Sequence, residues 1–308
     1  MSGVEANPSV SYPFRQTMSE EVRNCPLCGS SQSSPFDQRT FRGEQVTNRI
    51  CRSCGLVYQS PRMTQAELAD FYTRGYRELY QGGEKPGSKD LLAQRKRAIA
   101  LIHAVDGRLN KVTRHLDIGC SAGFLLERFL RRFACQPVGI EPGAAYREYA
   151  QNEGFTVYAS LDLMLAAGEK RFDFISMAHV LEHLPEPVSY LASLRENVLT
   201  PDGRLLVEVP NLYAHDCFEV AHLVAFSPHT LLQTLQQAGF TPLFLRRHGQ
   251  PRSKILPLYL TVLAKPRAHP MTLPVNEEKN VAMKRRLGLF RRQLLIRLLP
   301  RWAWLPAH

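Results

Sequence analysis

The sequence lacks the long apolar runs that place a chain in a membrane. Its 308 residues contain no uncharged apolar run of about 18 residues, so we expect no membrane-spanning helix. Residues 1–20 are predicted to be disordered, and they lack the apolar stretch of a secretory signal. Cysteine is sparse outside two pairs, because Cys120, Cys135 and Cys217 occur singly. Single thiols are typical of a reducing compartment, so we exclude an exported, disulfide-framed protein and expect a cytoplasmic one.

Basic charge is concentrated at one end of the chain. The formal net charge is +11, and residues 268–308 hold eight Lys or Arg against Glu277 and Glu278, so that this segment carries +6. The rest of the chain is only mildly basic. Its charge therefore does not require a nucleic-acid partner.

Four of the seven cysteines form two Cys-x-x-Cys pairs, Cys25/Cys28 and Cys51/Cys54, with 22 residues between the inner two. Two such pairs at this separation are typical of a zinc site with four cysteine ligands, and disulfides are the alternative. Because the protein would occupy all four coordination positions, the zinc would be structural. We therefore predict a zinc-ribbon domain over residues 21–60.

A short helix and a glycine-rich hinge follow the ribbon. Residues 65–72 have helical composition, and residues 81–88 form a low-complexity segment that marks a domain boundary. We predict a helical linker over residues 61–92. Tyr72 and Tyr76 recur at helical spacing, so they either pack in a core or close a pocket from the leader side.

Strands and helices alternate over residues 93–267. Strands are predicted at 115–119, 137–141, 155–158, 172–177, 203–210, 241–246 and 259–264, and helices at 91–105, 124–133, 144–153, 188–199 and 230–238. This order predicts an α/β fold, a Rossmann-like, doubly wound and mostly parallel sheet with helices on both faces. The last two strands are compatible with a hairpin that inserts one antiparallel strand.

The turn after the first of these strands carries the main functional pattern. It reads Leu116-Asp-Ile-Gly-Cys-Ser-Ala-Gly123 and opens a helix. Small residues there let the backbone approach a ligand, and the N–H groups of the helix point into the crevice. Glu141 ends the next strand, 24 residues after Asp117, where it can accept both hydroxyls of a ribose. Dinucleotides and S-adenosylmethionine both fit these features.

The chemistry of this turn favours S-adenosylmethionine. Asp117 precedes Gly119, Ser121 and Gly123 in the pattern D-x-G-x-S-x-G, and the turn contains no Lys or Arg that would hold a phosphate. The Asp117 carboxylate would repel a pyrophosphate, whereas it suits the cationic ammonium or sulfonium side of S-adenosylmethionine.

With these residues, the region from about Arg97 to Lys265 resembles class I S-adenosylmethionine-dependent methyltransferases. Further matching segments are Gly139–Pro142, Phe172–Pro187, Pro201–Asn211 and Phe226–Phe240. The cysteine-rich leader resembles that of bacterial methyltransferases that act on sugars, natural products or cell-surface polysaccharides. Sugar C-methyltransferases with such a leader continue into a further C-terminal domain, for which this chain is too short, so we expect O-methylation.

The resemblance implies that residues at the carboxyl ends of the first four strands hold S-adenosylmethionine. In strand order these are Asp117, Gly119, Ser121 and Gly123, then Glu141, then Ser160 and Leu161, and then Met177 and Ala178. The first group would contact the methionine and adenosine portions, the second the ribose, the third the adenine through its backbone, and the last the sulfonium methyl. A purely structural role for Asp117 and Glu141 is the alternative.

Three histidines are candidates for the base that removes a proton from the acceptor. His179 and His183 follow the fourth strand, and His222 comes after the fifth. The alternatives are a wall of the cofactor site for His179 and a helix-capping or surface position for His183. The main contributions of the protein to methyl transfer are positioning and the exclusion of water.

The C-terminal tail, residues 268–308, contains a partly amphipathic segment over residues 283–305. A helix there places Met283, Leu287, Phe290, Leu294 and Leu298 on one stripe, with Arg285 and Arg292 opposite and Trp302 and Trp304 following. Such a helix either lies on an anionic membrane surface, at the inner face of the membrane, or docks on the body of the protein or on a second copy.

Taken together, these features predict a methyltransferase that moves a methyl group from S-adenosylmethionine to a hydroxyl of a sugar-containing or other small-molecule metabolite. The first alternative is an RNA methyltransferase with the ribbon as its RNA-binding module. Residues 24–58 offer only four arginines for that purpose, so nucleic acid is not expected. The second alternative is a non-catalytic scaffold that binds S-adenosylmethionine, and the presence of both Asp117 and Glu141 argues against it.

Overall fold

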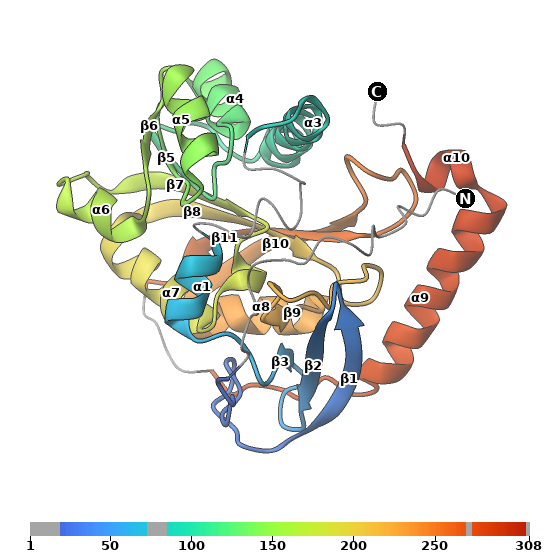
Figure 1. Ribbon diagram of the computed structural model, residues 1–308. Helices are drawn as coiled ribbons and strands as arrows, with labels where there is room; N and C mark the ends of the chain where they lie inside the picture. Colours follow the sequence, from blue (N-terminus) through green and yellow to red (C-terminus); the bar gives the residue numbers. More distant parts are fainter. Residues whose placement is uncertain (1–18, 73–84, 269–272, 306–308) are drawn as a thin grey trace.

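The computed structural model describes residues 19–72, 85–268 and 273–305 (Figure 1). The predicted disorder of the N-terminus falls almost entirely outside these ranges, and so does Tyr76.

A seven-stranded sheet forms the centre of the molecule, with strand order β10-β11-β8-β7-β4-β5-β6. Its strands are β4 (Arg114–Ile118), β5 (Gln136–Ile140), β6 (Thr156–Tyr158), β7 (Phe172–Ala178), β8 (Leu199–Pro210), β10 (Phe240–His248) and β11 (Tyr259–Pro266). Strands β4 to β8 are parallel to one another, whereas β11 is antiparallel to both β8 and β10. The predicted parallel sheet and its one antiparallel strand are therefore confirmed.

Helices cover both faces of this sheet (Figure 1). One face carries α3 (Ser88–Val105), α4 (Phe124–Phe133) and α5 (Ala144–Asn152), and the other carries α7 (Pro187–Ser193) and α8 (Pro228–Gln237), while α6 (Leu161–Ala166) follows β6. Each face has its own hydrophobic core, because successive side chains of a strand point to opposite faces. Phe174 of β7 packs in the core under α3 and α4, whereas Ile175 packs in the core under α7 and α8.

The helix predicted over 188–199 is shorter in the structure. The α-helix ends at Ser193, a π-helical turn covers Leu194–Val198, and β8 begins at Leu199. The strand starts early because Leu199 is buried and pairs with Phe172 of β7. The sequence pattern does not show where the helix ends and the strand begins, since short apolar stretches suit a helix and a strand equally well.

The cysteine-rich leader and the methyltransferase-like region share a second, four-stranded sheet of order β1-β2-β3-β9. Its strands are β1 (Ser33–Phe41), β2 (Glu44–Cys51), β3 (Val57–Gln59) and β9 (Val224–Ala225). The short helix α1 (Gln65–Asp70) follows β3. Strand β9 comes from the segment after β8 and pairs antiparallel with β3, and the Gln59 amide donates to the Leu223 carbonyl at 2.8 Å. The leader is thus joined by backbone hydrogen bonds to residues far away in the sequence.

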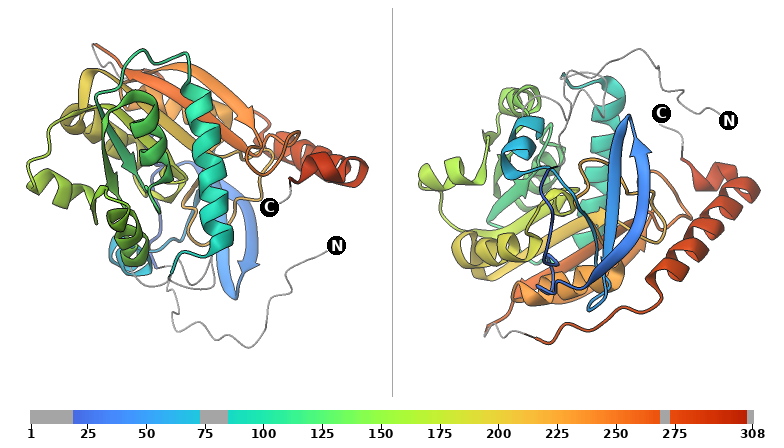
Figure 2. Two further views of the ribbon diagram at one scale, coloured as in Figure 1. Left: turned by 90° about the horizontal axis from the view of Figure 1, so that it is seen from above. Right: turned by 60° about the horizontal axis from the view of Figure 1, so that its bottom comes forward.

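The C-terminal tail forms α9 (Val281–Leu298) and α10 (Pro300–Ala303), which lie along one side of the molecule (Figure 2). Among the described residues, none of the helices combines the length and the apolar character needed to cross a membrane.

Candidate functional site

A pocket of 760 Å³ opens at the carboxyl ends of β4, β5 and β7. Because the carboxyl ends of parallel strands meet at one edge of the sheet, residues distant in the sequence converge there. Most of the predicted site residues line this pocket, namely Asp117, Gly119, Ser121, Glu141, Ser160, Leu161, Ala178, His179 and His183. Gly123, Met177 and His222 are not among the lining residues.

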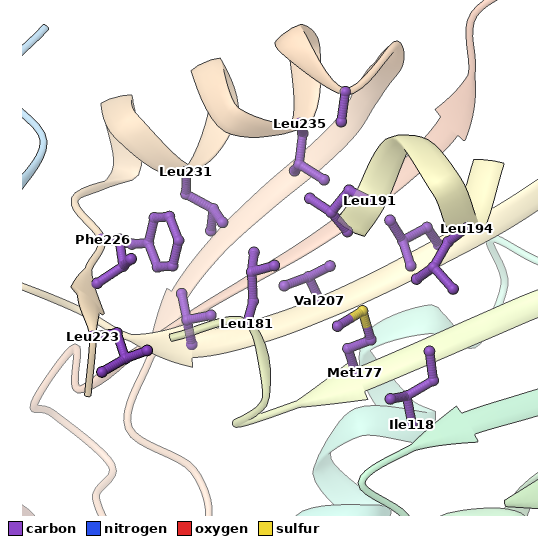
Figure 3. Packing of buried hydrophobic residues seen from close by; sticks show 14 of the residues in the cluster. Ile118, Met177, Leu181, Leu191, Leu194, Val207, Leu223, Phe226, Leu231 and Leu235 are labelled. Atoms are coloured by element: carbon purple, nitrogen blue, oxygen red, sulfur yellow. The ribbon is translucent and has the colours of Figure 1, made fainter. Parts of the chain in front are cut away.

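The Met177 side chain lies in the hydrophobic core instead. It is 1% exposed and packs with Val207, Leu191 and Ile118 under α7 and α8 (Figure 3). The alternation of β7 explains this position, because Ala178 faces the pocket and its neighbour must point away. We therefore exclude the Met177 side chain from the site.

Gly123 has a packing reason of its own. It is the N-cap of α4 with φ of +80°, and a Cβ there would lie 3.1 Å from the Phe155 ring and 3.2 Å from the Ala150 side chain. A left-handed φ and close neighbours both favour glycine. The residue shapes the turn, and it does not form the pocket wall.

Asp117 is the buried carboxylate at the end of β4. It is 4% exposed, and its Oδ1 accepts a hydrogen bond from the Ser176 hydroxyl of β7 at 2.6 Å. Burial raises the pKa of Asp117 to about 7, the negative charge of Glu141 acts in the same direction, and the bond from Ser176 opposes both. A cationic group in the pocket would stabilise the ionised form of Asp117.

His115 supports Asp117 from behind, although the sequence analysis assigns it no role. Its ring is fully buried and stacks on Phe129 with 4.0 Å between ring centroids, and burial lowers its pKa to about 3. The neutral ring bonds through Nε2 to the Ser176 hydroxyl at 2.8 Å, and that hydroxyl donates to Asp117. This chain of bonds orients the carboxylate. The only available signal is a histidine two residues before the acid, on the same side of the strand.

Glu141 ties the βα turn to the end of β5. Its Oε2 accepts from the Ser121 amide at 3.0 Å and its Oε1 from the Gly143 amide at 2.9 Å. The side chain is 4% exposed and lines the pocket. A carboxylate oxygen can accept more than one hydrogen bond, so Glu141 suits the hydroxyl groups of a ligand.

Helix α3 contributes polar groups that the sequence analysis missed. Asp90, Gln94 and Arg97 line the pocket. Gln94 accepts from the Ala122 amide at 3.2 Å, and Asp90 accepts from the Tyr146 hydroxyl at 2.6 Å. Helical periodicity identifies the apolar face of α3, but it does not say which polar positions face a ligand.

His179 lies between two carboxylates. Its Nδ1 is 3.1 Å from Glu182 Oε1 and its Nε2 is 3.5 Å from Glu208 Oε1, while Arg97 contacts the same ring. Burial opposes protonation of the ring, but the hydrogen bonds to Glu182 and Glu208 outweigh it and raise the pKa of His179. A raised pKa favours the protonated ring, which cannot accept a proton from a substrate. This environment favours the pocket-wall interpretation of His179.

Glu182, His183 and His222 form a separate cluster, in which one ligand atom of each residue lies within 4.8 Å of the others. The ring centroids of His183 and His222 are 5.0 Å apart. His183 bonds through Nδ1 to the Ala221 carbonyl at 2.8 Å, and His222 through Nδ1 to the Cys217 carbonyl at 2.9 Å. A carbonyl accepts only from a protonated nitrogen, so each neutral ring carries its lone pair on Nε2.

The charges within this cluster follow from its burial. Burial lowers the pKa of His183 to about 4, against the influence of Glu182, so the ring is neutral at pH 7. Burial disfavours ionisation of Glu182, but the hydrogen bond to His179 and the neighbouring histidines hold its pKa at about 2. Glu182 Oε2 is buried and has no hydrogen-bond partner within the described part of the chain. The cluster therefore offers an ionised carboxylate, the neutral ring of His183 and a second imidazole, a donor set that suits a proton or a divalent cation.

The four leader cysteines gather into one cluster. The Cys25 and Cys54 sulfurs are 3.6 Å apart, and the Cys28 and Cys51 sulfurs are 3.5 Å apart. These separations exclude disulfides, whose bond is about 2.05 Å, and approach the edges of about 3.8 Å expected for four thiolates around zinc. The donor set and its spacing therefore fit a four-thiolate metal site.

Known proteins with similar sequences are methyltransferases. Residues 91–243 match a family described as a methyltransferase domain. The ubiquinone biosynthesis O-methyltransferase of Cereibacter sphaeroides is 34% identical over 107 residues, which are 32% of this chain and 41% of that protein. The enzyme of the same name from Nitrosococcus oceani is 30% identical over 152 residues, 47% of this chain and 61% of that protein. The chain thus matches less than two thirds of the length of these relatives.

A solved structure with the same fold is the 1,6-didemethyltoxoflavin-N1-methyltransferase of Burkholderia thailandensis, which was crystallised with S-adenosylhomocysteine. It has a TM-score of 0.52 and 22% identity, and the match covers 75% of this chain and 99% of that one. Together with the strand order and the pocket, these findings define a class I S-adenosylmethionine-dependent methyltransferase fold. Residues 91–243 therefore match a methyltransferase domain and have the fold of S-adenosylmethionine-dependent methyltransferases, and the four-cysteine leader precedes them, as the sequence predicts.

Proposed function

We propose that this methyltransferase acts on a hydroxyl group of a sugar-containing or other small-molecule metabolite, with His183 as the base. The observation that carries the proposal is the position of neutral His183, beside ionised Glu182, on the wall of the same pocket as Asp117 and Glu141.

The cofactor half of the proposal rests on the two buried carboxylates. S-adenosylmethionine supplies a methyl group that its sulfonium activates for displacement. Asp117 suits the ammonium group of the methionine portion, because a cation offsets the cost of ionising a buried carboxyl. Glu141 would accept the ribose hydroxyls, and the backbone at Ser160 and Leu161 would face the adenine. Gly119 has φ of +77° and lies at the pocket wall, so the turn can approach the ligand without a side chain.

The acceptor half rests on the cluster around His183. The hydroxyl proton of the acceptor would move to His183 Nε2 as the oxygen attacks the methyl carbon. Ionised Glu182 would stabilise the imidazolium that forms, while the Ala221 carbonyl fixes the ring in the required tautomer. His222 does not line the pocket, so we propose it as a positioning residue that acts through its contact with His183.

A small hydroxylated acceptor is favoured over RNA by two observations. The catalytic groups are buried in a pocket, and Arg39 of the leader is engaged with Asp37 and Asp216, at 2.7 Å to each carboxylate. The names of the relatives describe O-methyl transfer. O-methylation is therefore our proposal, ahead of C- or N-methylation.

We also propose that the four cysteines bind Zn²⁺ with a structural role. Each half of the cluster is a turn whose glycine, Gly29 or Gly55, donates its amide to the carbonyl of the first cysteine at 2.9 Å. Strand β3 of this leader pairs with β9, which begins two residues after His222. The ion would thereby stabilise the acceptor side of the pocket as well as the leader.

The substitution His183→Gln tests the acceptor chemistry. We expect the rate of labelled methyl transfer into a small-metabolite extract to fall by roughly 100- to 10,000-fold, the usual contribution of a general base. Calorimetry should show unchanged affinity for S-adenosylmethionine. His229→Gln is the matched control, because His229 is half-buried, does not line the pocket and bonds to the Asn276 carbonyl. Normal turnover by His183→Gln, or label found in RNA alone, would contradict the proposal.

A further inference from the structure

Helix α9 is held to the body through its polar and small residues. Val281 and Arg285 are buried, and Arg285 donates to the carbonyls of Leu212 and His215 and lies 3.5 Å from Asp216. Gly288 faces the same loop so closely that a Cβ would lie 1.9 Å from the Tyr213 carbonyl oxygen. This face includes Arg285, one of the residues that the sequence analysis places opposite the apolar stripe.

The apolar stripe of α9 therefore points away from the body. Its members are Met283, Leu287, Phe290, Leu294 and Leu298, which we call the outer stripe. Their exposed fractions run from 44% for Leu294 to 67% for Leu298, with 64% for Phe290. Trp302 of α10 is also 55% exposed at the same end of the tail. Large side chains on a contiguous outer face are unusual for a soluble surface and mark an interaction site.

Cations flank the outer stripe on both sides. At 3.6 residues per turn, Arg286 and Arg297 lie roughly 60–80° to one side of its centre, and Arg291 lies about 60° to the other. The sequence contains no Asp or Glu from Lys279 to His308. The surface is thus a row of apolar side chains with two arginines on one side and one on the other.

We infer that the outer stripe binds the surface of a membrane that contains anionic lipids. Apolar side chains at such a surface enter the boundary between headgroups and acyl chains, while flanking arginines contact lipid phosphates. Trp302 suits the same depth, because its ring is amphipathic. A second copy of the chain is a poorer occupant, since pairing two outer stripes would bring the flanking arginines together without any carboxylate between them.

Binding of the full chain to vesicles tests this inference. One set contains phosphatidylglycerol in phosphatidylcholine, and the other is pure phosphatidylcholine. We expect sedimentation with the first set and little with the second. Leu287→Gln with Phe290→Gln should weaken binding by roughly tenfold or more. Arg291→Gln with Arg297→Gln should weaken it by roughly fivefold per charge, and added salt should mimic that loss.

The matched control is Leu163→Gln with Leu243→Gln, two leucines that are 55% and 46% exposed on other parts of the surface. It should bind like the unaltered chain, and circular dichroism should show that all variants are folded. Equal sedimentation with both vesicle sets, or by the Leu287/Phe290 variant and its control, would overturn the inference. So would a lipid-free dimer that the Leu287/Phe290 variant abolishes. These readouts need no methyl acceptor and are independent of the proposed reaction.

Discussion

The two walls of the pocket are built in different ways. The wall with Asp117 and Glu141 comes from one strand–helix–strand segment, in which the Ser121 amide and its acceptor Glu141 are 20 positions apart. The wall with His183 needs the Ala221 carbonyl, 38 positions away, and the strand that follows Ala221 pairs with β3 of the leader. One wall is local in the sequence and the other is assembled from three distant segments. We therefore expect that a change in one wall impairs either cofactor binding or acceptor chemistry and leaves the other unchanged.

The carboxylates of the two walls also differ in charge state. Burial raises the pKa of Asp117 to about 7, whereas Glu182, which burial also disfavours as an anion, has a pKa of about 2. The difference lies in their neighbours, because Glu182 bonds to His179, whose pKa is raised, and Asp117 bonds to a neutral hydroxyl. The neighbouring histidines already stabilise the Glu182 anion. Asp117 becomes fully ionised at neutral pH only with a cationic ligand.

Removal of the leader metal should have the largest effect, and it should impair turnover without impairing cofactor binding. If the cysteines hold Zn²⁺, then Cys51→Ser, or chelation of the ion, releases β3 and with it β9 beside His222. We expect turnover to fall by roughly 100-fold or more, the low end of what loss of a base costs. Affinity for S-adenosylmethionine, measured by calorimetry, should stay within about twofold, as for distant sites.

Cys135→Ser is the control for this change, because Cys135 is a buried thiol outside the leader. Metal analysis should find zinc in the unaltered chain and in Cys135→Ser, but not in Cys51→Ser. Equal loss of cofactor affinity and of turnover would show that the two walls do not fail separately.

Asp117→Asn should impair cofactor binding without impairing acceptor chemistry. We expect affinity for S-adenosylmethionine to fall by roughly 10- to 100-fold, the cost of one hydrogen bond to a charged group. A carboxyl whose folded pKa is raised destabilises the fold progressively as pH rises from about 4 to 7. The melting temperature of Asp117→Asn at pH 8 should therefore equal or exceed that of the unaltered chain. Asp202→Asn, at an exposed position, is the control, and a large drop in stability of Asp117→Asn would refute this account.

Acidification should also affect the two walls of the pocket differently, with a smaller effect on the kinetics. Between pH 8 and pH 6, Asp117 becomes protonated while His183, with a pKa of about 4, remains neutral. We expect KM for S-adenosylmethionine to rise by up to about tenfold per pH unit below 7, with kcat nearly constant. Steady-state kinetics in Asp117→Asn should lose the dependence of KM on pH. A kcat that falls with pH at constant KM would reverse the assignment of the two groups.

The elements that were predicted well carry strong local signals. The helix over 124–133 begins and ends as predicted, and β4 and β5 differ by one residue at each end. The D-x-G-x-S-x-G turn and Glu141 were also found from the sequence to lie at the pocket, because strand ends and turn residues are local properties. Met177 was misplaced for a related reason, since period-two alternation leaves open which of two neighbours faces the pocket.

The residues that were missed depend on contacts across the fold. His115 gains its role from Ser176, 61 positions away, and Arg97 from Glu208, 111 positions away. The apolar pattern of 283–298 predicts a helix but not which face meets the body. Packing of Gly288 and Arg285 against the loop after β8 decides that question.

The sequence by itself determined the alternating α/β order, the four-cysteine leader and the acids at the ends of β4 and β5, because spacing and residue type along a short segment suffice for each. Only the tertiary structure decided that β9 joins the leader sheet, that the pKa of His179 is raised while that of His183 is lowered, and that the outer stripe faces solvent. Burial and the charge of neighbours set these properties, and both arise only when distant segments pack together.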